Sequence, residues 1–149
     1  MDYSGSCLCG SVKFSFPYDP MLHLKCHCKV CQKIFGGSLH ALAMPLDELK
    51  ISGDLSSYTT TGGSGNDLHY NFCPKCGTSI FNKPDLLDPM VYLPAGLLDG
   101  QIEFSPTVEL WSANKPSSVP EAPTTRAAFE DNGTAERLTE MLENLEQRA

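Results

Sequence analysis

The sequence predicts a mainly β protein built from short antiparallel strands. Proline and glycine recur along its 149 residues, and the segments between them alternate apolar and polar side chains, as in the run from Ser11 to Phe16. Several of these segments border clusters of cysteine, so bound metal ions would pin the strand ends. The length and the 41% hydrophobic content indicate a single domain over residues 1–149.

The strands are expected in order along the chain, beginning with the run from Ser11 to Phe16. The other candidates are similar short runs: Leu22–Cys26, Ser38–Met44, Leu49–Ser52, Ser57–Thr60, Leu68–Phe72, Ser79–Asn82 and Met90–Leu93. The segment from Pro45 to Leu49 predicts one turn of helix before the next strand. The glycine-rich run from Thr61 to Asn66 predicts a hairpin connection, with a substrate lid as the alternative.

The C-terminal third differs in composition from the rest of the chain. Four prolines after Ser105 predict an extended segment that wraps over the sheet and contains the single tryptophan, Trp111. Residues 134–148 predict a C-terminal helix with Thr134 as its N-cap, because four apolar residues follow the i, i+3, i+4, i+7 pattern: Leu138, Met141, Leu142 and Leu145. This apolar stripe is expected to pack on its own domain, and a homo-oligomer seam is the alternative.

Charge and hydropathy exclude several classes of protein. The formal net charge is −7 and the basic residues form no continuous stripe, which argues against a nucleic-acid partner. No apolar stretch is long enough to span a membrane, and the N-terminus lacks the features of a signal peptide, so a soluble cytoplasmic protein is expected. Three lysines near the second cysteine cluster, Lys25, Lys29 and Lys33, could form a positive patch for an anionic small molecule, or simply a solvated loop.

Seven cysteines in three clusters carry the strongest functional signal. They are Cys7 and Cys9, then Cys26, Cys28 and Cys31, then Cys73 and Cys76. An odd number of cysteines argues against a disulfide framework, and reduced cysteines are typical of the cytoplasm. The clusters instead have the spacing of metal ligands, and their 2 + 3 + 2 arrangement divides into one site of four thiolates and one of three.

The two outer clusters predict a structural zinc site. Cys73-Pro-Lys-Cys76-Gly77 has the form of a zinc knuckle, and the period of a strand would point Cys7 and Cys9 to the same side. A redox-active pair is the alternative for a single C-x-x-C motif, but such pairs lie in a βαβ setting that this chain does not offer. We therefore expect Cys7, Cys9, Cys73 and Cys76 to hold one zinc ion.

The middle cluster predicts a second zinc site in which the fourth ligand is open. His27 lies between two ligands and should point away from the metal, whereas His40 or His69 could close the site from elsewhere in the fold. Otherwise the fourth position is available to water or to a thiol. Because three thiolates make zinc a weak Lewis acid, activation of a bound thiol is favoured over hydrolysis.

The three cysteine motifs together resemble the glutathione-dependent formaldehyde-activating enzyme family, which also includes centromere protein V. The resemblance covers roughly residues 4–100 and is carried by three segments in order: Gly5–Val12, Cys26–Lys33 with Gly36-Gly37-Ser38, and Phe72–Thr78. It implies a β-tent fold with two zinc ions. It also implies that Cys7, Cys9, Cys73 and Cys76 are structural ligands and that Cys26, Cys28 and Cys31 form the active centre.

The resemblance further implies a carbon–sulfur lyase, similar to S-(hydroxymethyl)glutathione synthase, that serves formaldehyde detoxification. Glutathione would be the small-molecule thiol, and Lys29 or Lys33 would hold one of its carboxylates. Two alternatives remain from the residues themselves. An apolar wall of Ile34, Phe35 and Phe72 would favour another thiol or electrophile. A fourth protein ligand would favour a non-catalytic zinc module that binds a protein partner through its C-terminal helix or the Trp111 segment.

Overall fold

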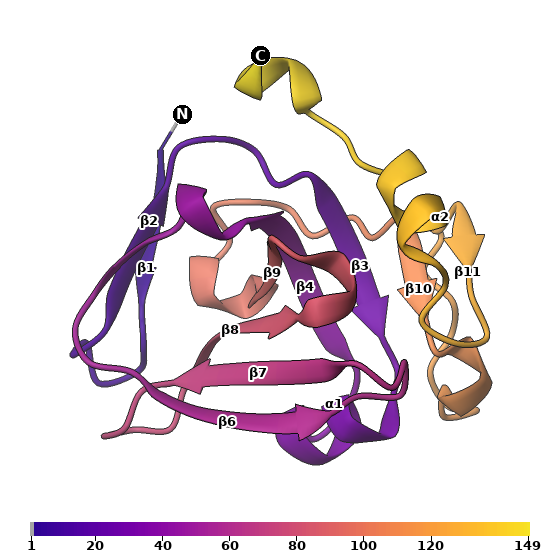
Figure 1. Ribbon diagram of the computed structural model, residues 1–149, viewed down its shortest axis with the longest axis horizontal. Coiled ribbons are helices and arrows are strands. Elements are labelled where there is room, and N and C mark those ends of the chain that lie inside the picture. Colours follow the sequence, from indigo (N-terminus) through magenta and orange to yellow (C-terminus); the bar gives the residue numbers. More distant parts are fainter. Residues whose placement is uncertain (1) are drawn as a thin grey trace.

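The computed structural model describes residues 2–149, and the chain is mainly β, as predicted (Figure 1). The strands are β1 Tyr3–Ser6, β2 Lys13–Phe16, β3 Leu22–Cys26, β4 Leu39–Pro45, β5 Lys50–Ser52, β6 Ser56–Thr61, β7 Asp67–Phe72, β8 Ser79–Pro84, β9 Met90–Pro94, β10 Val108–Leu110 and β11 Ala127–Ala128. The α-helices are α1 Lys29–Phe35 and α2 Ala135–Glu140, and five short 3₁₀ turns are η1 Leu46–Glu48, η2 Asp85–Leu87, η3 Ala95–Leu98, η4 Ser112–Asn114 and η5 Leu145–Arg148.

The strands form two sheets. The smaller has the order β1-β2-β5, and the larger has the order β11-β10-β3-β4-β9-β8-β7-β6. Neighbouring strands are antiparallel, except that β10 runs parallel to both β3 and β11. In Figure 1 the β1–β2 pair and the β3–β4 pair stand on two sides, and β6, β7 and β8 cross below them, which agrees with the predicted tent of short strands.

The large sheet is covered on both faces, and the side chains of β4 alternate between the two apolar clusters that cover it. Leu39, Ala41 and Ala43 belong to an apolar cluster under the C-terminal segment, whereas the alternate residues Leu42 and Met44 belong to a second cluster shared with β1 and β2. A strand buried on both faces reads as a continuous apolar run instead of an alternating one. Cys26, Cys28 and Cys31 border the first cluster, and Cys7 and Cys73 lie in the second.

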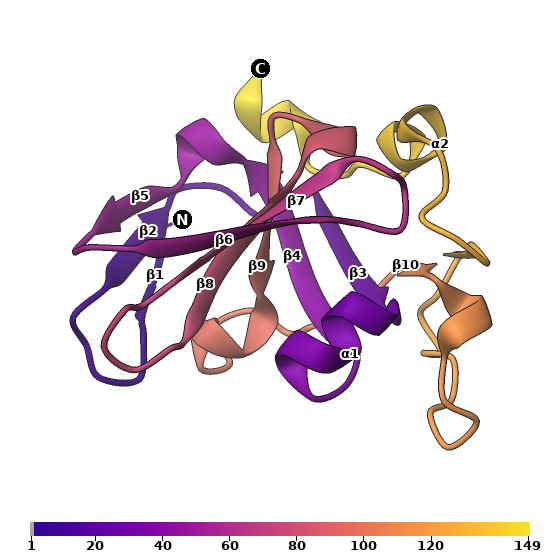
Figure 2. The same cartoon turned by 60° about the horizontal axis from the view of Figure 1, so that its bottom comes forward.

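Helix α1 is a local feature that the strand and helix patterns did not predict. The Cys28 sulfur accepts a hydrogen bond from the Cys31 N–H (3.2 Å) and so caps the N-terminus, and Gly36 ends the helix in the left-handed conformation (φ 74°). Figure 2 shows α1 at the ends of β3 and β4. A helix of only seven residues with a cysteine as its cap has no conventional start signal.

The segment after Ser105 was predicted only to wrap over the sheet. It also adds strands to it. Residues 108–110 form β10 and extend the large sheet beside β3, with Leu110 opposite Cys26. Trp111 follows directly in a left-handed conformation (φ 57°), and its N–H donates to the Asp131 carbonyl oxygen (2.8 Å). This pairing fixes Trp111 next to the middle cysteine cluster.

The predicted continuous helix over residues 134–148 is wrong in its length. Thr134 is the N-cap, as predicted, but α2 ends at Glu140, and η5 follows after a turn in which Asn144 is left-handed (φ 60°). Tertiary hydrogen bonds compete with the helix here, because the Glu143 N–H donates to Met21 (2.7 Å) and the Asn144 amide to Pro20 (2.9 Å). Buried Leu138 and the partly buried Met141 and Leu142 do pack on the protein's own core.

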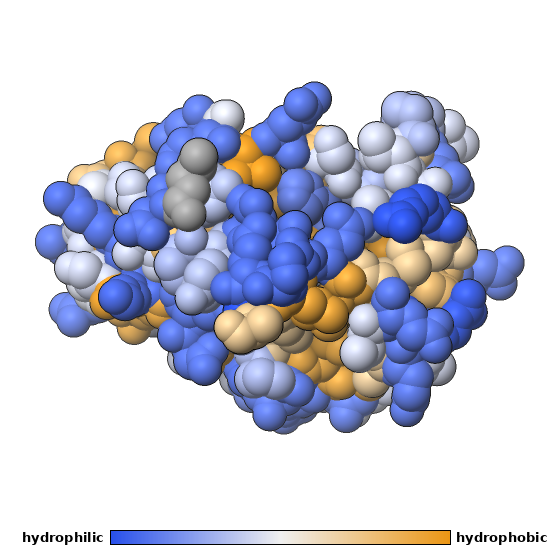
Figure 3. All heavy atoms as spheres, turned by 90° about the horizontal axis from the view of Figure 1, so that it is seen from above, coloured by the Kyte–Doolittle hydropathy of each residue, from blue (hydrophilic) through white to orange (hydrophobic). Residues whose placement is uncertain are grey.

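The surface is largely polar on the face seen from above. Apolar atoms gather in one area on the side where Figure 1 places α2 and β10 (Figure 3). Within residues 2–149, no helix has the length and apolar character that crossing a membrane would require.

Candidate metal centres and pocket

The two outer cysteine clusters meet in space, as the spacing predicted. Cys7 and Cys9 lie in the turn between β1 and β2, Cys73 and Cys76 lie in the turn between β7 and β8, and the four sulfurs lie within 4.8 Å of one another. The Cys7–Cys9 and Cys9–Cys73 sulfur distances are 3.6 and 3.8 Å. A tetrahedron with Zn–S bonds of about 2.3 Å has an edge of about 3.8 Å, so the donor set fits zinc.

Hydrogen bonds shape these two turns around the sulfurs. The Cys73 sulfur accepts from the N–H groups of Lys75 and Cys76 (3.4 and 3.5 Å), and Gly77 adopts a left-handed conformation (φ 77°) that closes the turn. The Thr78 hydroxyl and the backbone N–H groups of Thr78 and Cys9 lower the pKa of Cys76 to about 5. These contacts therefore favour the Cys76 thiolate, which is the metal-binding form.

The middle cluster brings three buried sulfurs together at the end of β3 and the start of α1. Mutual hydrogen bonding lowers the pKa of Cys28 to about 3, because the thiols of Cys26 and Cys31 donate to its sulfur. The contact with Cys28 raises the pKa of Cys26 to about 12, and the contacts with Cys26 and Cys28 raise that of Cys31. Without a cation the three groups thus share one negative charge, and a metal ion would allow all three to ionise.

The fourth position of this group is supplied by none of the predicted histidines. His27 points away, as expected, with its ring nitrogens 2.5 Å from the Ser38 hydroxyl and 2.7 Å from the Glu109 carboxylate. His40 stacks on Phe104, and His69 contacts Thr59 and Asp85. Among residues 2–149, no further cysteine, histidine or carboxylate joins the three sulfurs.

Glu109 organises the region behind this group, and no motif in the sequence marks it. One of its oxygens contacts His27, and the other accepts from the Ala122 N–H (2.9 Å) and the Thr125 hydroxyl (2.5 Å). His27 is flanked by Cys26 and Cys28, and its N–H donates to the Leu110 carbonyl oxygen (3.0 Å). The buried Glu109 therefore fixes the backbone on which the two sulfurs sit.

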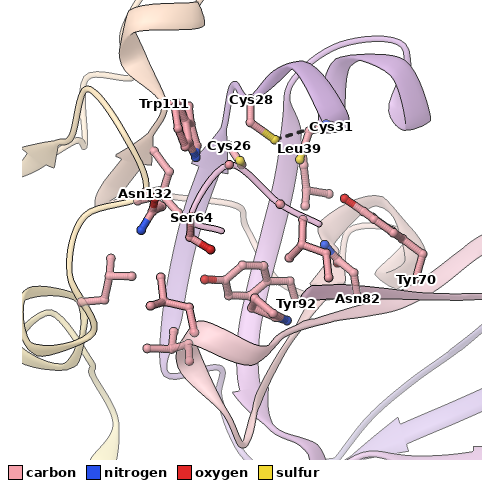
Figure 4. A pocket seen from close by; sticks show the side chains of 18 residues that line it. Cys26, Cys28, Cys31, Leu39, Ser64, Tyr70, Asn82, Tyr92, Trp111 and Asn132 are labelled. Carbon is pink, nitrogen blue, oxygen red and sulfur yellow. Dashed lines mark hydrogen bonds between the residues drawn. The ribbon is translucent and has the colours of Figure 1, made fainter. Parts of the chain in front are cut away.

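A pocket opens beside the three sulfurs, and the sequence did not predict its walls (Figure 4). It encloses about 570 Å³, including its opening to solvent. Besides the three cysteines it is lined by Leu39, Gly62, Gly63, Ser64, Leu68, Tyr70, Asn82, Pro84, Leu86, Leu87, Tyr92, Leu110, Trp111, Asn132 and Leu138. Only about 60 Å³ of this space is free for the centre of a water-sized molecule, so it holds a few small groups beside the sulfurs.

The run from Thr61 to Asn66 forms the predicted hairpin connection, and its tip also borders this pocket. The Gly62 N–H donates to the Asn66 carbonyl oxygen (2.8 Å), which closes the hairpin between β6 and β7. Gly63 lies against the Trp111 ring so closely that a Cβ atom would come within 2.3 Å of it. Two segments far apart in sequence thus meet at the pocket mouth.

The residues predicted to contact a substrate lie elsewhere. Lys29 and Lys33 are exposed on α1, and neither lines the pocket beside the sulfurs. Ile34, Phe35 and Phe72 line a separate hollow on the other side of Tyr70. The apolar wall beside the sulfurs is built instead by leucines and Trp111 from several elements.

These features define a class: a mainly β protein with two cysteine centres that could bind zinc, one of which opens onto a pocket. The family model for the glutathione-dependent formaldehyde-activating enzyme matches residues 2–114, and the chain belongs to this family. No curated protein matches the chain. A crystal structure of a Rhodobacter sphaeroides protein is similar in fold, with a TM-score of 0.52 and 19% identity over 85% of this chain and 98% of that one.

Proposed function

We propose that the protein is a zinc-dependent carbon–sulfur lyase that joins glutathione to formaldehyde and gives S-hydroxymethylglutathione. One observation carries the proposal: Cys26, Cys28 and Cys31 converge beside a pocket, with no fourth protein ligand among residues 2–149. Family membership supports a glutathione-dependent reaction of an aldehyde. The seven cysteines are free, which supports a cytoplasmic location.

The reaction requires a reactive sulfur beside an accessible carbonyl carbon. When held by Cys26, Cys28 and Cys31, zinc would lower the pKa of a coordinated thiol so that the thiolate is present at neutral pH. The pocket side of the three sulfurs leaves room for that thiol and for the aldehyde. The sulfur donates an electron pair to the carbonyl carbon, the C=O bond becomes C–O, and the proton lost by the thiol ends on that oxygen.

The remaining roles follow from position. Cys7, Cys9, Cys73 and Cys76 would hold a second zinc ion that is structural, since their four sulfurs lie within 4.8 Å of one another between two turns. Lys29 and Lys33 could contact a glutathione carboxylate only outside the pocket, on the exposed side of α1.

The substitution Cys28→Ser tests the proposed centre. Serine preserves the N-cap of α1, so the fold should persist, whereas the metal group loses one ligand. We expect zinc content to fall from two ions per chain toward one, with little change in melting temperature. We also expect exchange between glutathione and ¹³C-formaldehyde, followed by NMR, to fall to the buffer rate. Exchange at the wild-type rate in the variant would refute the assignment.

A further inference from the structure

We propose that the pocket beside Cys26, Cys28 and Cys31 binds thiol–aldehyde adducts that carry an uncharged hydrocarbon substituent, with the adduct hydroxyl held by Tyr70 and Asn82. This inference rests on the proposed function and names its substrate class. The reaction remains R–SH + R′–CHO → R–S–CH(OH)–R′, in which an S–C bond forms and the thiol proton moves to oxygen. No oxidant or reductant is needed.

The pocket wall is uncharged. Among the described residues that line it there is no lysine, arginine, histidine, aspartate or glutamate. Glutathione carries carboxylates and an ammonium group, and burying such charges without partners is strongly unfavourable. The charged ends of glutathione must therefore lie outside, and an uncharged group fills the space beside the sulfurs.

The apolar character of the wall is the second argument. Six leucines and Trp111 line the pocket: Leu39, Leu68, Leu86, Leu87, Leu110 and Leu138. Formaldehyde brings no hydrocarbon to contact them. Each methylene group buried in such surroundings increases affinity roughly fourfold, so an aliphatic substituent of several carbons matches the wall better than formaldehyde alone.

Two buried polar atoms supply the third argument. The Asn82 amide oxygen has no hydrogen-bond partner among residues 2–149, and the Tyr70 hydroxyl has none apart from a contact with the Cys31 sulfur, although both residues are only 3% exposed. The two residues face each other across β7 and β8, and Asn82 also pairs with Tyr92 of β9. Figure 4 shows this row of side chains below the three sulfurs.

The chemistry of the two atoms matches one hydroxyl group. A tyrosine hydroxyl can donate a hydrogen bond, and an amide oxygen accepts one. The hydroxyl of a thiol–aldehyde adduct both accepts and donates, so it would satisfy both atoms at once. Burial of unpaired polar groups is otherwise unfavourable, which is why such atoms in a pocket point to a ligand.

Fluorescence of the single tryptophan provides a binding assay, because Trp111 lines the pocket. The zinc-loaded full-length protein is titrated with butane-1-thiol and with glutathione. We expect butane-1-thiol to bind at least about tenfold more tightly. Ser64→Phe at the hairpin tip should abolish this preference, whereas Ser57→Phe, on exposed β6 outside the pocket, should preserve it. Equal affinities, or no effect of Ser64→Phe, would overturn the inference.

Exchange NMR then distinguishes where the hydrocarbon resides. Three pairs are compared: glutathione with formaldehyde, glutathione with pentanal, and butane-1-thiol with formaldehyde. Faster exchange of the second pair places the substituent on the aldehyde, and faster exchange of the third places it on the thiol. Fastest exchange of the first pair would refute the substrate class but support the proposed function. Tight binding of butane-1-thiol without any exchange would refute the proposed reaction but would still support the preference of the pocket for hydrocarbon groups.

The hydroxyl contacts are tested by Asn82→Leu, with Asn71→Leu as the matched control on the neighbouring strand. If Asn82 were only structural, removing its unpaired polar atom would preserve or raise stability and leave turnover unchanged. We expect unchanged stability with kcat/KM lowered about 10- to 100-fold for the preferred pair. Tyr70→Phe should act similarly at unchanged zinc content, whereas loss of zinc would mean that Tyr70 supports the metal group instead. Unchanged turnover in both variants would overturn the assignment.

Discussion

Glu109 shows how a single side chain can set the position of the middle cysteine cluster without touching its sulfurs. Burial alone would raise the pKa of this carboxyl, but hydrogen bonds from Thr125, His27 and the Ala122 N–H, together with the charge of Lys25, lower it. The carboxylate is thus the form that the folded protein stabilises. Its contribution is present above the ordinary glutamate pKa of 4.5 and is lost as the pH falls through the lowered value.

The substitution Glu109→Gln tests this role. The amide preserves shape but removes the charge and one acceptor, so we expect a loss of about 1.5–3 kcal/mol in the free energy of unfolding at pH 7. Urea unfolding between pH 7 and pH 3 should show that the difference between wild type and variant shrinks below about pH 4.5, where the carboxylate of the unfolded wild-type chain takes up a proton. The difference should disappear once the folded carboxyl, with its lowered pKa, is protonated as well. A difference that does not depend on pH would mean that the charge plays no part.

At the scale of elements, the β6–β7 hairpin and the β10 segment form the pocket mouth by mutual contact. Trp111 is held in a left-handed conformation by its hydrogen bond to Asp131, and the hairpin fits against its ring only because residue 63 is glycine. The hairpin itself makes regular antiparallel pairs from Ser56 to Thr61. A side chain at residue 63 would therefore displace the tip or the ring.

The substitution Gly63→Ala should separate the hairpin tip from Trp111. The added Cβ atom would overlap the ring at 2.3 Å, whereas the stability of this exposed turn should change by less than about 0.5 kcal/mol. We expect a red-shifted tryptophan emission and weaker binding of butane-1-thiol by about threefold or more. Gly37→Ala is the control, because nothing lies within 4 Å of an added Cβ atom there. Unchanged emission would show that the contact does not shape the mouth.

At the scale of the whole molecule, the outer cysteine group joins the two sheets. It ties the β1–β2 turn of the small sheet to the β7–β8 turn of the large sheet, next to an apolar cluster that contains residues of both. Cys7 and Cys73 are part of that cluster, so the proposed ion would lie at the edge of the core. Removing one of these ligands should therefore affect the fold as well as metal binding.

The substitution Cys76→Ser is expected to cost at least about 5 kcal/mol, because structural zinc contributes about 10–16 kcal/mol in small zinc-finger peptides. A domain of this size has a total stability of about 5–15 kcal/mol, so partial or complete unfolding at 25 °C should follow. Circular dichroism melts with zinc analysis provide the measurement. Cys28→Ser is the matched comparison, and equal stability of the two variants would contradict the division into structural and catalytic ions.

The sequence predicted the features that depend on local spacing. Cysteine spacing predicted both groups of sulfurs that could hold a metal ion, and the period-2 pattern predicted most strands, because ligand and strand geometry repeat over a few residues. The pocket was missed because Tyr70, Asn82 and Trp111 come together only through sheet pairing. The C-terminal helix was overextended because hydrogen bonds from residues 143 and 144 to Pro20 and Met21 outweigh its apolar periodicity.

Part of the pocket wall comes from outside the region that matches the family model. The match ends at residue 114, yet Asn132 and Leu138 contribute to the pocket. The cysteines and this part of the wall thus lie on different stretches of the chain. Exchanging the tail after residue 114 between relatives would change which molecules are accepted, while the metal-binding cysteines stay the same. This tail is therefore the place to start in redesigning the protein for new aldehydes or thiols.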